Sequence, residues 1–370
     1  MKNDSELLCT IALGMVPGVG DINAKKLISH LGSASAVLSE PYHKLLQIPG
    51  IGKTIASHIS SKKFREKAAE ELDYVRKHDI AIRRFDDHDY PLRLKECPDS
   101  PLLIYMKGNV DLNRDRIISI VGTRNITRKG KDICQSIIHD LAGEYPELVI
   151  SSGLAYGVDI TAHKAALKEG LMTIAVLGHG FRTIYPGVHL PVAKQIISQG
   201  ALITDFPSSE SPERNNFIKR NRIIAGISDA TLIIESGRKG GAMVTADIAL
   251  SYNREVMAVP GSPGLPASEG CNLLIKSNRA ALVESADDIF YTLNWLKVSK
   301  VNKQRKLFPE NLSPLEEQIF ELINENQEVS SDQIARSLEK PFHQLSSALL
   351  KLEFSGLVES IPGNIYRLKN

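Results

Sequence analysis

The sequence predicts an α/β protein, with an extended Rossmann-like, doubly wound core between an N-terminal helical domain and a C-terminal winged helix. Three observations support this prediction: apolar segments that alternate with helical patterns, a repeated glycine turn near the start, and three helical patterns before a hairpin at the end. At 370 residues the chain can form two or three domains with buried cores. The expected domains are residues 1–65, 66–296 and 311–370, with a linker at 297–310.

The first 65 residues contain an internal repeat. The turns VPGVG (16–20) and IPGIG (48–52) lie about 32 residues apart, and each precedes a helical pattern, so we expect two helix-hairpin-helix-like units. Such turns expose backbone N–H groups at a helix start, where phosphates can bind. Lys and Arg outnumber Asp and Glu by 8 to 4 in this region. Packing alone explains the repeat almost as well, so duplex DNA binding stays an open alternative.

The central region predicts a parallel sheet. Its six expected strands are residues 117–121, 148–152, 173–177, 201–204, 231–234 and 256–259. Nearly continuous apolar strands separated by helices are typical of a sheet that is covered on both faces. Before them, residues 66–112 form a transitional region, with one helical pattern at 70–78 and then a segment interrupted by prolines.

The end of the chain has a different charge. The linker is cationic, whereas residues 311–370 contain 5 basic and 9 acidic residues. Their pattern of three helices and a hairpin predicts a winged helix. The third helix, expected at 341–354, carries a single basic residue, Lys351. Because a helix that reads a DNA groove needs several cations, we expect this domain to contact a protein partner.

Composition excludes several classes of protein. The chain is 42% hydrophobic and 24% charged, which is typical of globular domains and not of disordered ones. Its four cysteines are far apart and form no C-x-x-C pair, so neither a disulfide framework nor a zinc site is indicated. No apolar run approaches the ~20 residues that span a bilayer. We therefore expect a cytoplasmic protein with no metal and no membrane role.

The expected strand ends carry the candidate site. Ligands of an open parallel sheet bind beyond the carboxyl ends of its strands. Here these ends carry glycine turns, at residues 122–125, 152–159, 178–180 and 236–241. Each turn can offer backbone N–H groups to an anion, and the helical segment 214–222 adds cations without any acidic residue. Phosphate groups are therefore the expected ligands, whereas Asp159 is expected to cap its own helix.

The same region lacks a recognisable catalytic set. Three histidines lie near the strand ends, but no Ser-His-Asp, Cys-His or paired-carboxylate arrangement accompanies them, and nucleotide-binding fingerprints are missing. Phe217 shares a helix face with Arg214, a pattern that suits base stacking on a single strand, although a core position explains it equally well. Two alternatives remain: a Rossmann-like enzyme acting on a nucleotide or nucleoside phosphate, and a protein-interaction scaffold.

Four segments resemble the DprA/Smf family of DNA-processing proteins. They are VGTR at 121–124, SGLAYGVD at 152–159, Phe217 with RNRIIAG at 220–226, and VPGS at 259–262. The resemblance spans roughly residues 80–290. It implies a non-catalytic homodimer, without a cofactor, that binds and protects single-stranded DNA and helps to load the RecA recombinase in natural transformation and recombination.

The resemblance also implies a set of DNA-binding residues. They are Gly122, Thr123, Arg124, Arg214, Phe217, Lys219, Arg220, Lys239 and Thr245. The sequence departs from the family pattern at Tyr156, where a basic residue is usual, and at Ile218, where proline is usual. Lys219 can restore part of the missing charge.

Overall fold

A nine-stranded sheet forms the centre of the first part of the chain. The computed structural model describes residues 2–295, 312–326, 328–355, 357–361 and 363–368. The chain divides into two units at residue 296. The strands of the central sheet are β1 (Ala81–Arg84), β2 (Leu103–Gly108), β3 (Ile117–Val121), β4 (Val149–Ser152), β5 (Met172–Val176), β6 (Ala201–Thr204), β7 (Ala230–Ile233), β8 (Glu255–Ala258) and β9 (Ala281–Leu282).

The strand order is β1-β2-β6-β5-β4-β3-β7-β8-β9. The seven neighbouring strands β6, β5, β4, β3, β7, β8 and β9 run parallel to one another. Strands β1 and β2 are antiparallel to their neighbours. From β3 the chain proceeds outward through β4, β5 and β6, and then returns to β7 on the other side of β3. This order confirms the predicted Rossmann-like core, and each of the six predicted strands lies within one residue of its expected position.

Strands β1 and β2 correct the description of residues 66–112 as transitional. They pair with each other, and β2 pairs with β6, so this segment extends the sheet. Strand β1 carries two arginines, Arg83 and Arg84, and the described segment between the two strands contains one helix, α7 (Leu92–Lys95), of four residues. The alternation of apolar strands with long helical patterns that marks the rest of the sheet is therefore missing here, and the sequence does not reveal these strands.

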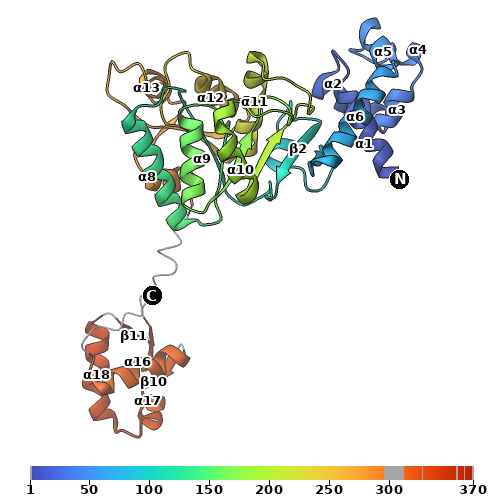
Figure 1. The fold of residues 1–370 in the computed structure, drawn as a ribbon. Helices are drawn as coiled ribbons and strands as arrows, with labels where there is room; N and C mark the ends of the chain where they lie inside the picture. Colours follow the sequence, from blue (N-terminus) through green and yellow to red (C-terminus); the bar gives the residue numbers. More distant parts are fainter. Residues whose placement is uncertain (1, 296–311, 327, 356, 362, 369–370) are drawn as a thin grey trace. The chain divides into compact units, whose positions relative to one another are not determined.

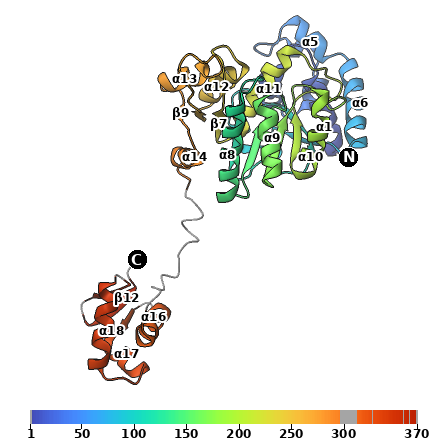
Figure 2. The same ribbon diagram turned by 60° about the vertical axis from the view of Figure 1, so that its left-hand side comes forward.

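Helices cover both faces of the sheet. One face is packed by α8 (Arg128–Glu144), α9 (Val158–Lys168), α10 (Leu190–Gln199) and α14 (Ala286–Thr292), and the other by α7, α11 (Arg214–Ile227), α12 (Gly241–Ser251) and α13 (Glu269–Lys276). Strand β3 shows the alternation that this requires, because Ile118 packs against α8 whereas Ile117 belongs to the opposite core. Helices α8 and α9 lie side by side in both views (Figures 1 and 2).

The N-terminal helices pack at one end of the sheet, next to β2 (Figure 1). They are α1 (Lys2–Gly14), α2 (Gly20–Leu31), α3 (Ala34–Ser39), α4 (Tyr42–Leu45), α5 (Lys53–Ile59) and α6 (Lys63–Lys77). Helices α2 and α5 begin at the two predicted glycine turns. Gly18 and Gly50 have φ values of 85° and 91°, which explains the need for glycine at these turns. Helix α6 belongs to the same hydrophobic core, so the helical domain continues past residue 65, where the sequence placed its end.

Polar side chains connect the helical domain to the sheet. The carboxylate of Glu71 accepts hydrogen bonds from the backbone N–H (2.8 Å) and the hydroxyl (2.6 Å) of Ser208. Lys25 Nζ donates to the carbonyl (2.8 Å) and the hydroxyl (2.7 Å) of Ser100. Two separate helices of the domain are thus bonded to the core, which fixes its orientation.

The cysteines are free thiols buried in these two domains. Burial raises the pKa of Cys97 to about 11 and that of Cys134 and Cys271 to about 12. Burial also raises the pKa of Cys9. All four therefore stay protonated near neutral pH, as small apolar residues of the core do.

The second unit is the predicted winged helix. It contains α16 (Pro314–Asn326), β10 (Glu328–Ser330), α17 (Ser331–Ser337), α18 (Phe342–Phe354), β11 (Val358–Ile361) and β12 (Ile365–Leu368). The last two strands form the expected hairpin, and β10 adds a third strand that was not expected. The cationic linker at 297–310 lies outside the described residues. Within the described ranges, every helix is too short or too polar to span a bilayer.

Candidate nucleic-acid interface

The candidate interface lies at the carboxyl ends of the parallel strands. We call it the rim: the turns 122–124, 153–157, 177–185 and 234–240, after β3, β4, β5 and β7, together with the first turn of α11. The chain order reverses between β3 and β7, and ligands of open α/β sheets bind at such a switch point. The topology therefore brings together the predicted turns that were separated in sequence.

The turn after β3 is fixed by backbone hydrogen bonds. Thr123 N donates to the carbonyl of Glu235 (2.7 Å), and the carbonyl of Thr123 accepts from Val158 N (3.1 Å). A Cβ atom at Gly122 would lie 2.8 Å from the Glu235 carbonyl, so only glycine fits there. Arg124 follows with an exposed side chain. This turn thus presents one cation from a rigid backbone.

The N-terminus of α8 is already occupied by a carboxylate. Glu235 accepts hydrogen bonds from the backbone N–H (2.9 Å) and the hydroxyl (2.5 Å) of Thr127, which caps α8 by accepting from Gly130 N (3.0 Å). Asp159 does not cap its helix in the expected way, since it accepts from Ala155 N (3.3 Å) in the preceding turn. Not every glycine turn is therefore an open phosphate cradle, contrary to the sequence-based expectation.

Arg220 lies beneath the rim. Its side chain is buried, with the residue 4% exposed, and donates to the carbonyl of Gly153 (2.8 Å) and to that of Val176. Burial lowers the pKa of Arg220 to about 10, with Asp159 opposing and Arg124 adding to this shift. The guanidinium thus stays charged at neutral pH. It organises the ends of β4 and β5 from inside and has little surface left for a ligand.

Phe217 is half-buried at the start of α11. A Cβ atom at Gly178 would lie 2.7 Å from its Cδ1, so the ring packs directly on the end of β5. The ring centroid lies 5.9 Å from the Arg220 guanidinium carbon and 5.6 Å from the ring of Tyr185. The ring is therefore packed in part, and the rest of the residue remains accessible to solvent.

The remaining predicted residues separate into two groups. Arg214 is the first residue of α11 and is exposed, and Lys239 is exposed in the turn after β7. Lys219 is exposed but lines a cleft on the other side of α11. Thr245 is only 2% exposed, and its hydroxyl donates to the Gly241 carbonyl (3.2 Å) within α12. Arg214 and Lys239 thus lie on the rim surface, whereas Lys219 and Thr245 do not.

Several exposed cations of the rim and the adjacent start of α8 have no ion pair within the described residues. They are Arg124, Arg128, Lys129, Lys131, Arg214 and Lys239. An exception is Arg238, whose Nε lies 3.3 Å from Glu269. Unpaired cations on a rigid edge attract a polyanion, and this attraction weakens as salt is added.

The sequence interpretation missed two features of the rim. Tyr185 was not considered, and Tyr156 was regarded only as a lost cation, yet both are exposed aromatic residues in strand-end turns. Glu235 was not recognised as the partner of Thr127. Tyr185 could have been suspected from its position in a turn after a predicted strand, but nothing in the sequence places Glu235 beside α8.

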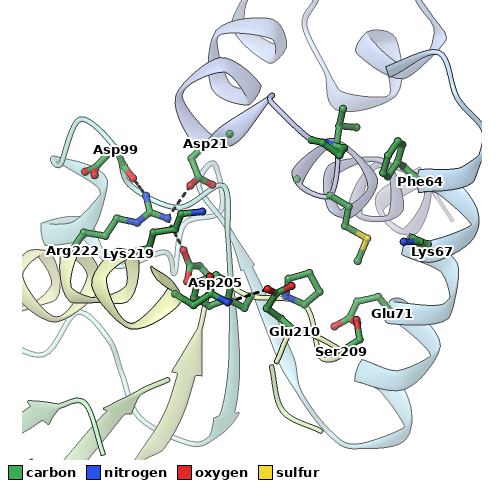
Figure 3. Close-up of a pocket in the computed structure, with 18 of the residues that line it drawn as sticks. Asp21, Phe64, Lys67, Glu71, Asp99, Asp205, Ser209, Glu210, Lys219 and Arg222 are labelled. Carbon is green, nitrogen blue, oxygen red and sulfur yellow. Dashed lines mark hydrogen bonds and ion pairs between the residues drawn. The ribbon is translucent and has the colours of Figure 1, made fainter. Parts of the chain in front are cut away.

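A cleft of about 910 Å³ lies between the helical domain and the core (Figure 3). Its charged lining residues are Asp21, Glu70, Glu71, Asp99, Asp205 and Glu210, together with Lys67, Arg182, Lys219 and Arg222. Six acids against four bases make the cleft a poor site for a polyanion.

Arg222 connects the two walls of this cleft. Its Nη2 lies 2.8 Å from Asp21 of the helical domain and 2.5 Å from Asp205 of the core, and its Nη1 donates to the Asp99 carbonyl (Figure 3). Burial alone would lower the pKa of Arg222, but the two carboxylates raise it. This arginine is an internal ion-pair partner.

The chain matches three family models. Residues 81–294 match DNA recombination-mediator protein A, residues 304–364 match the DprA winged helix domain, and residues 8–72 match the helix-hairpin-helix motif. Protein Smf of Escherichia coli is 35% identical over 77% of this chain and 76% of its own length. DNA processing protein DprA of Bacillus subtilis is 35% identical over 65% of this chain and 80% of its own length.

Solved structures show the same fold. The structure of DNA processing protein A from Streptococcus pneumoniae aligns with a TM-score of 0.57 at 28% identity, covering 73% of this chain and 96% of the other. A protein from Helicobacter pylori, described by its single-stranded DNA binding mode, aligns with a TM-score of 0.52 at 26% identity, covering 58% and 95%.

Proposed function

The chain belongs to the DNA recombination-mediator protein A family, and from this premise we propose that its rim binds single-stranded DNA. The observation that carries the proposal is the set of exposed cations, without ion pairs among the described residues, at the same edge of the sheet as the half-buried ring of Phe217. Exposed guanidinium and ammonium groups neutralise phosphates, and an accessible aromatic ring stacks a base whatever its sequence. We expect binding with little sequence preference.

We infer a binding protein rather than an enzyme. A nucleotide enzyme on this sheet would be expected to place a phosphate at the N-terminus of α8, but the carboxylate of Glu235 already satisfies Thr127 there. This observation favours binding over catalysis.

The proposal extends to what such binding would achieve. We propose that the protein protects single strands in the cytoplasm, that it acts as a homodimer, and that it helps to load the RecA recombinase in transformation and recombination. The support for these steps is the family membership. The winged helix is proposed to contact a protein partner, because Leu350 and Phe354 are exposed on its third helix and the domain is acidic.

A salt titration tests the electrostatic part of the proposal. Affinity for an oligothymidylate is measured at several salt concentrations for the wild type, Arg124→Ala and Lys168→Ala. Arg124→Ala should weaken binding and reduce the slope of log affinity against log salt by about 1, because one phosphate contact is lost. Lys168 is an exposed cation at the far end of α9 and serves as the matched control. Equal effects of the two substitutions would refute a specific role for the rim.

Phe217→Ala tests the stacking part. Loss of one base–aromatic contact should cost about 1–3 kcal/mol of binding free energy, while Phe217→Tyr should bind as the wild type does. Unchanged affinity of the alanine variant would show that the ring does not contact a base.

A further inference from the structure

We propose that Tyr156 and Tyr185 continue the stacking surface begun by Phe217, so that successive bases of one strand lie on a row of aromatic rings along the rim. The inference rests on the proposed function and deepens it, because it assigns base contacts to two residues beyond those already considered.

The first pair of rings is Tyr185 and Phe217. Their centroids lie 5.6 Å apart with an interplanar angle of 40°, and Tyr185 is 45% exposed. The rings come from different elements, the turn after β5 and the start of α11. Their contact places an accessible ring beside the residue that we expect to stack a base.

The second pair is Tyr156 and His189. Their ring centroids lie 5.0 Å apart at an angle of 65°, and Tyr156 is 47% exposed. His189 ends the short 3₁₀ helix Gly187–His189, which begins two residues after Tyr185. The segment 185–189 therefore contributes one ring to each pair, and the pairs belong to the turns that follow β4 and β5.

Internal hydrogen bonds hold this arrangement in place before any ligand binds. Tyr185 N donates to His179 Nε2 (3.3 Å), so the proton of that ring lies on Nδ1, which donates to the Gly180 carbonyl (2.8 Å). His189 Nδ1 lies 2.8 Å from the carbonyl of Leu154, in the turn that carries Tyr156. Because the backbone beneath the tyrosines is fixed, binding needs little reorganisation.

The chemistry of the rings indicates what they bind. An exposed phenol ring carries no charge at neutral pH and offers an aromatic face to any of the four bases. The tyrosines should therefore strengthen binding to bases without adding to its salt dependence, whereas Arg124 should act on the phosphates alone. The two kinds of contact can be separated by removing the bases from the ligand.

The experiment compares an oligothymidylate with an abasic strand of the same length, using the full chain. The variants are Tyr156→Leu, Tyr185→Leu and the corresponding Phe substitutions, with Arg124→Ala as reference. Each Leu variant should bind the oligothymidylate roughly tenfold more weakly and the abasic strand within about twofold of the wild type, with an unchanged salt slope. The Phe variants should bind both strands normally, because the ring is retained.

Other outcomes distinguish the inference from the proposed function. If the Leu variants weaken both strands equally, or neither strand, the aromatic row is wrong. If Arg124→Ala leaves binding to the abasic strand unchanged, the proposed function itself fails. As an independent measurement, 2-aminopurine in the strand should be quenched on binding to the wild type and less quenched by each Leu variant that remains folded. Equal quenching in all variants would also overturn the inference.

Discussion

The rim and the cleft lie on either side of α11, and each uses an arginine from that helix in a different way. Arg220 donates to the backbone carbonyls of Gly153 and Val176, and among the described residues no carboxylate forms an ion pair with it, although Asp159 favours its charged form from nearby. Arg222, two residues later, is neutralised by Asp21 and Asp205. The number of basic residues in a segment therefore does not decide what the segment does. The acidic residues that pair with them decide whether it attracts a polyanion or joins two domains.

The largest effect should come from breaking the ion pairs that join the two walls of the cleft. Arg222→Met leaves the nearly buried carboxylate of Asp205 and the partly exposed carboxylate of Asp21 without their cation, which should lower the free energy of unfolding by about 3 kcal/mol. Urea denaturation of the full chain measures this. The control is Arg76→Met, which removes an exposed ion pair with Asp4 and should cost less than about 1 kcal/mol. Similar values for the two variants would contradict the role assigned to Arg222.

A buried histidine of α9 should make the stability of the fold depend on pH. His163 lies in α9 with Nδ1 2.8 Å from the Thr173 hydroxyl, and burial, aided by Arg220, lowers its pKa to about 3. Between pH 6.5 and about 3 the unfolded chain binds a proton that the folded chain excludes, so stability falls as the pH falls through this window. From pH 7 to pH 5 this amounts to about 2 kcal/mol.

Urea denaturation at these two pH values gives the measurement. In the His163→Gln variant, the loss of stability between pH 7 and pH 5 should be smaller by about 2 kcal/mol than in the wild type. The control variant His139→Gln, at an exposed position, should lose nearly as much stability as the wild type. An identical pH dependence of wild type and His163→Gln would contradict the prediction.

A smaller change is expected at the N-terminus of α8. Glu235→Gln keeps an acceptor for Thr127 but removes a negative charge from the rim, which should cost less than about 1 kcal/mol of stability. Affinity for single strands should rise severalfold at low salt and less at high salt. Equilibrium binding at two salt concentrations measures this, and a lower affinity at low salt would contradict the electrostatic account.

The smallest effect is expected for the exposed cation Lys67 of the cleft. Lys67→Glu should change single-strand affinity by less than about twofold, because the acidic lining already makes this surface unfavourable for phosphates. Arg124→Glu is the matched charge reversal on the rim and should abolish most binding. A comparable loss in the two variants would place the nucleic acid in the cleft as well.

The sequence predicted the fold because its signals were periodic. Apolar strands between helices specified the parallel sheet, and the glycine repeat located α2 and α5. Strands β1 and β2 were not predicted because β1 carries Arg83 and Arg84 and no long helical pattern separates the two strands. The boundary of the helical domain was placed too early, at residue 65, because a charged helix such as α6 gives no sign of which domain it packs against.

The site was predicted less completely. The turn containing Arg124 and the half-buried Phe217 lie at the same edge of the sheet, as predicted, since parallel strands end at one edge. Lys219 and Arg220 are adjacent in sequence, yet one lies on the cleft and the other beneath the rim. Only the rotation of α11 decides this, and a run of cations on all sides of a helix does not reveal it. Tyr185 was missed because aromatic residues in loops carry no periodic signal.

The buried thiols of the first unit have a practical consequence. Because all four thiols are protonated and buried, an alkylating reagent would modify them only in molecules that have locally unfolded. The rate of labelling would therefore report how often such unfolding occurs. Cys9 belongs to the hydrophobic core of the helical domain and Cys134 to a core between α8 and the sheet. Mass spectrometry of the labelled peptides would therefore reveal which of the two domains opens first.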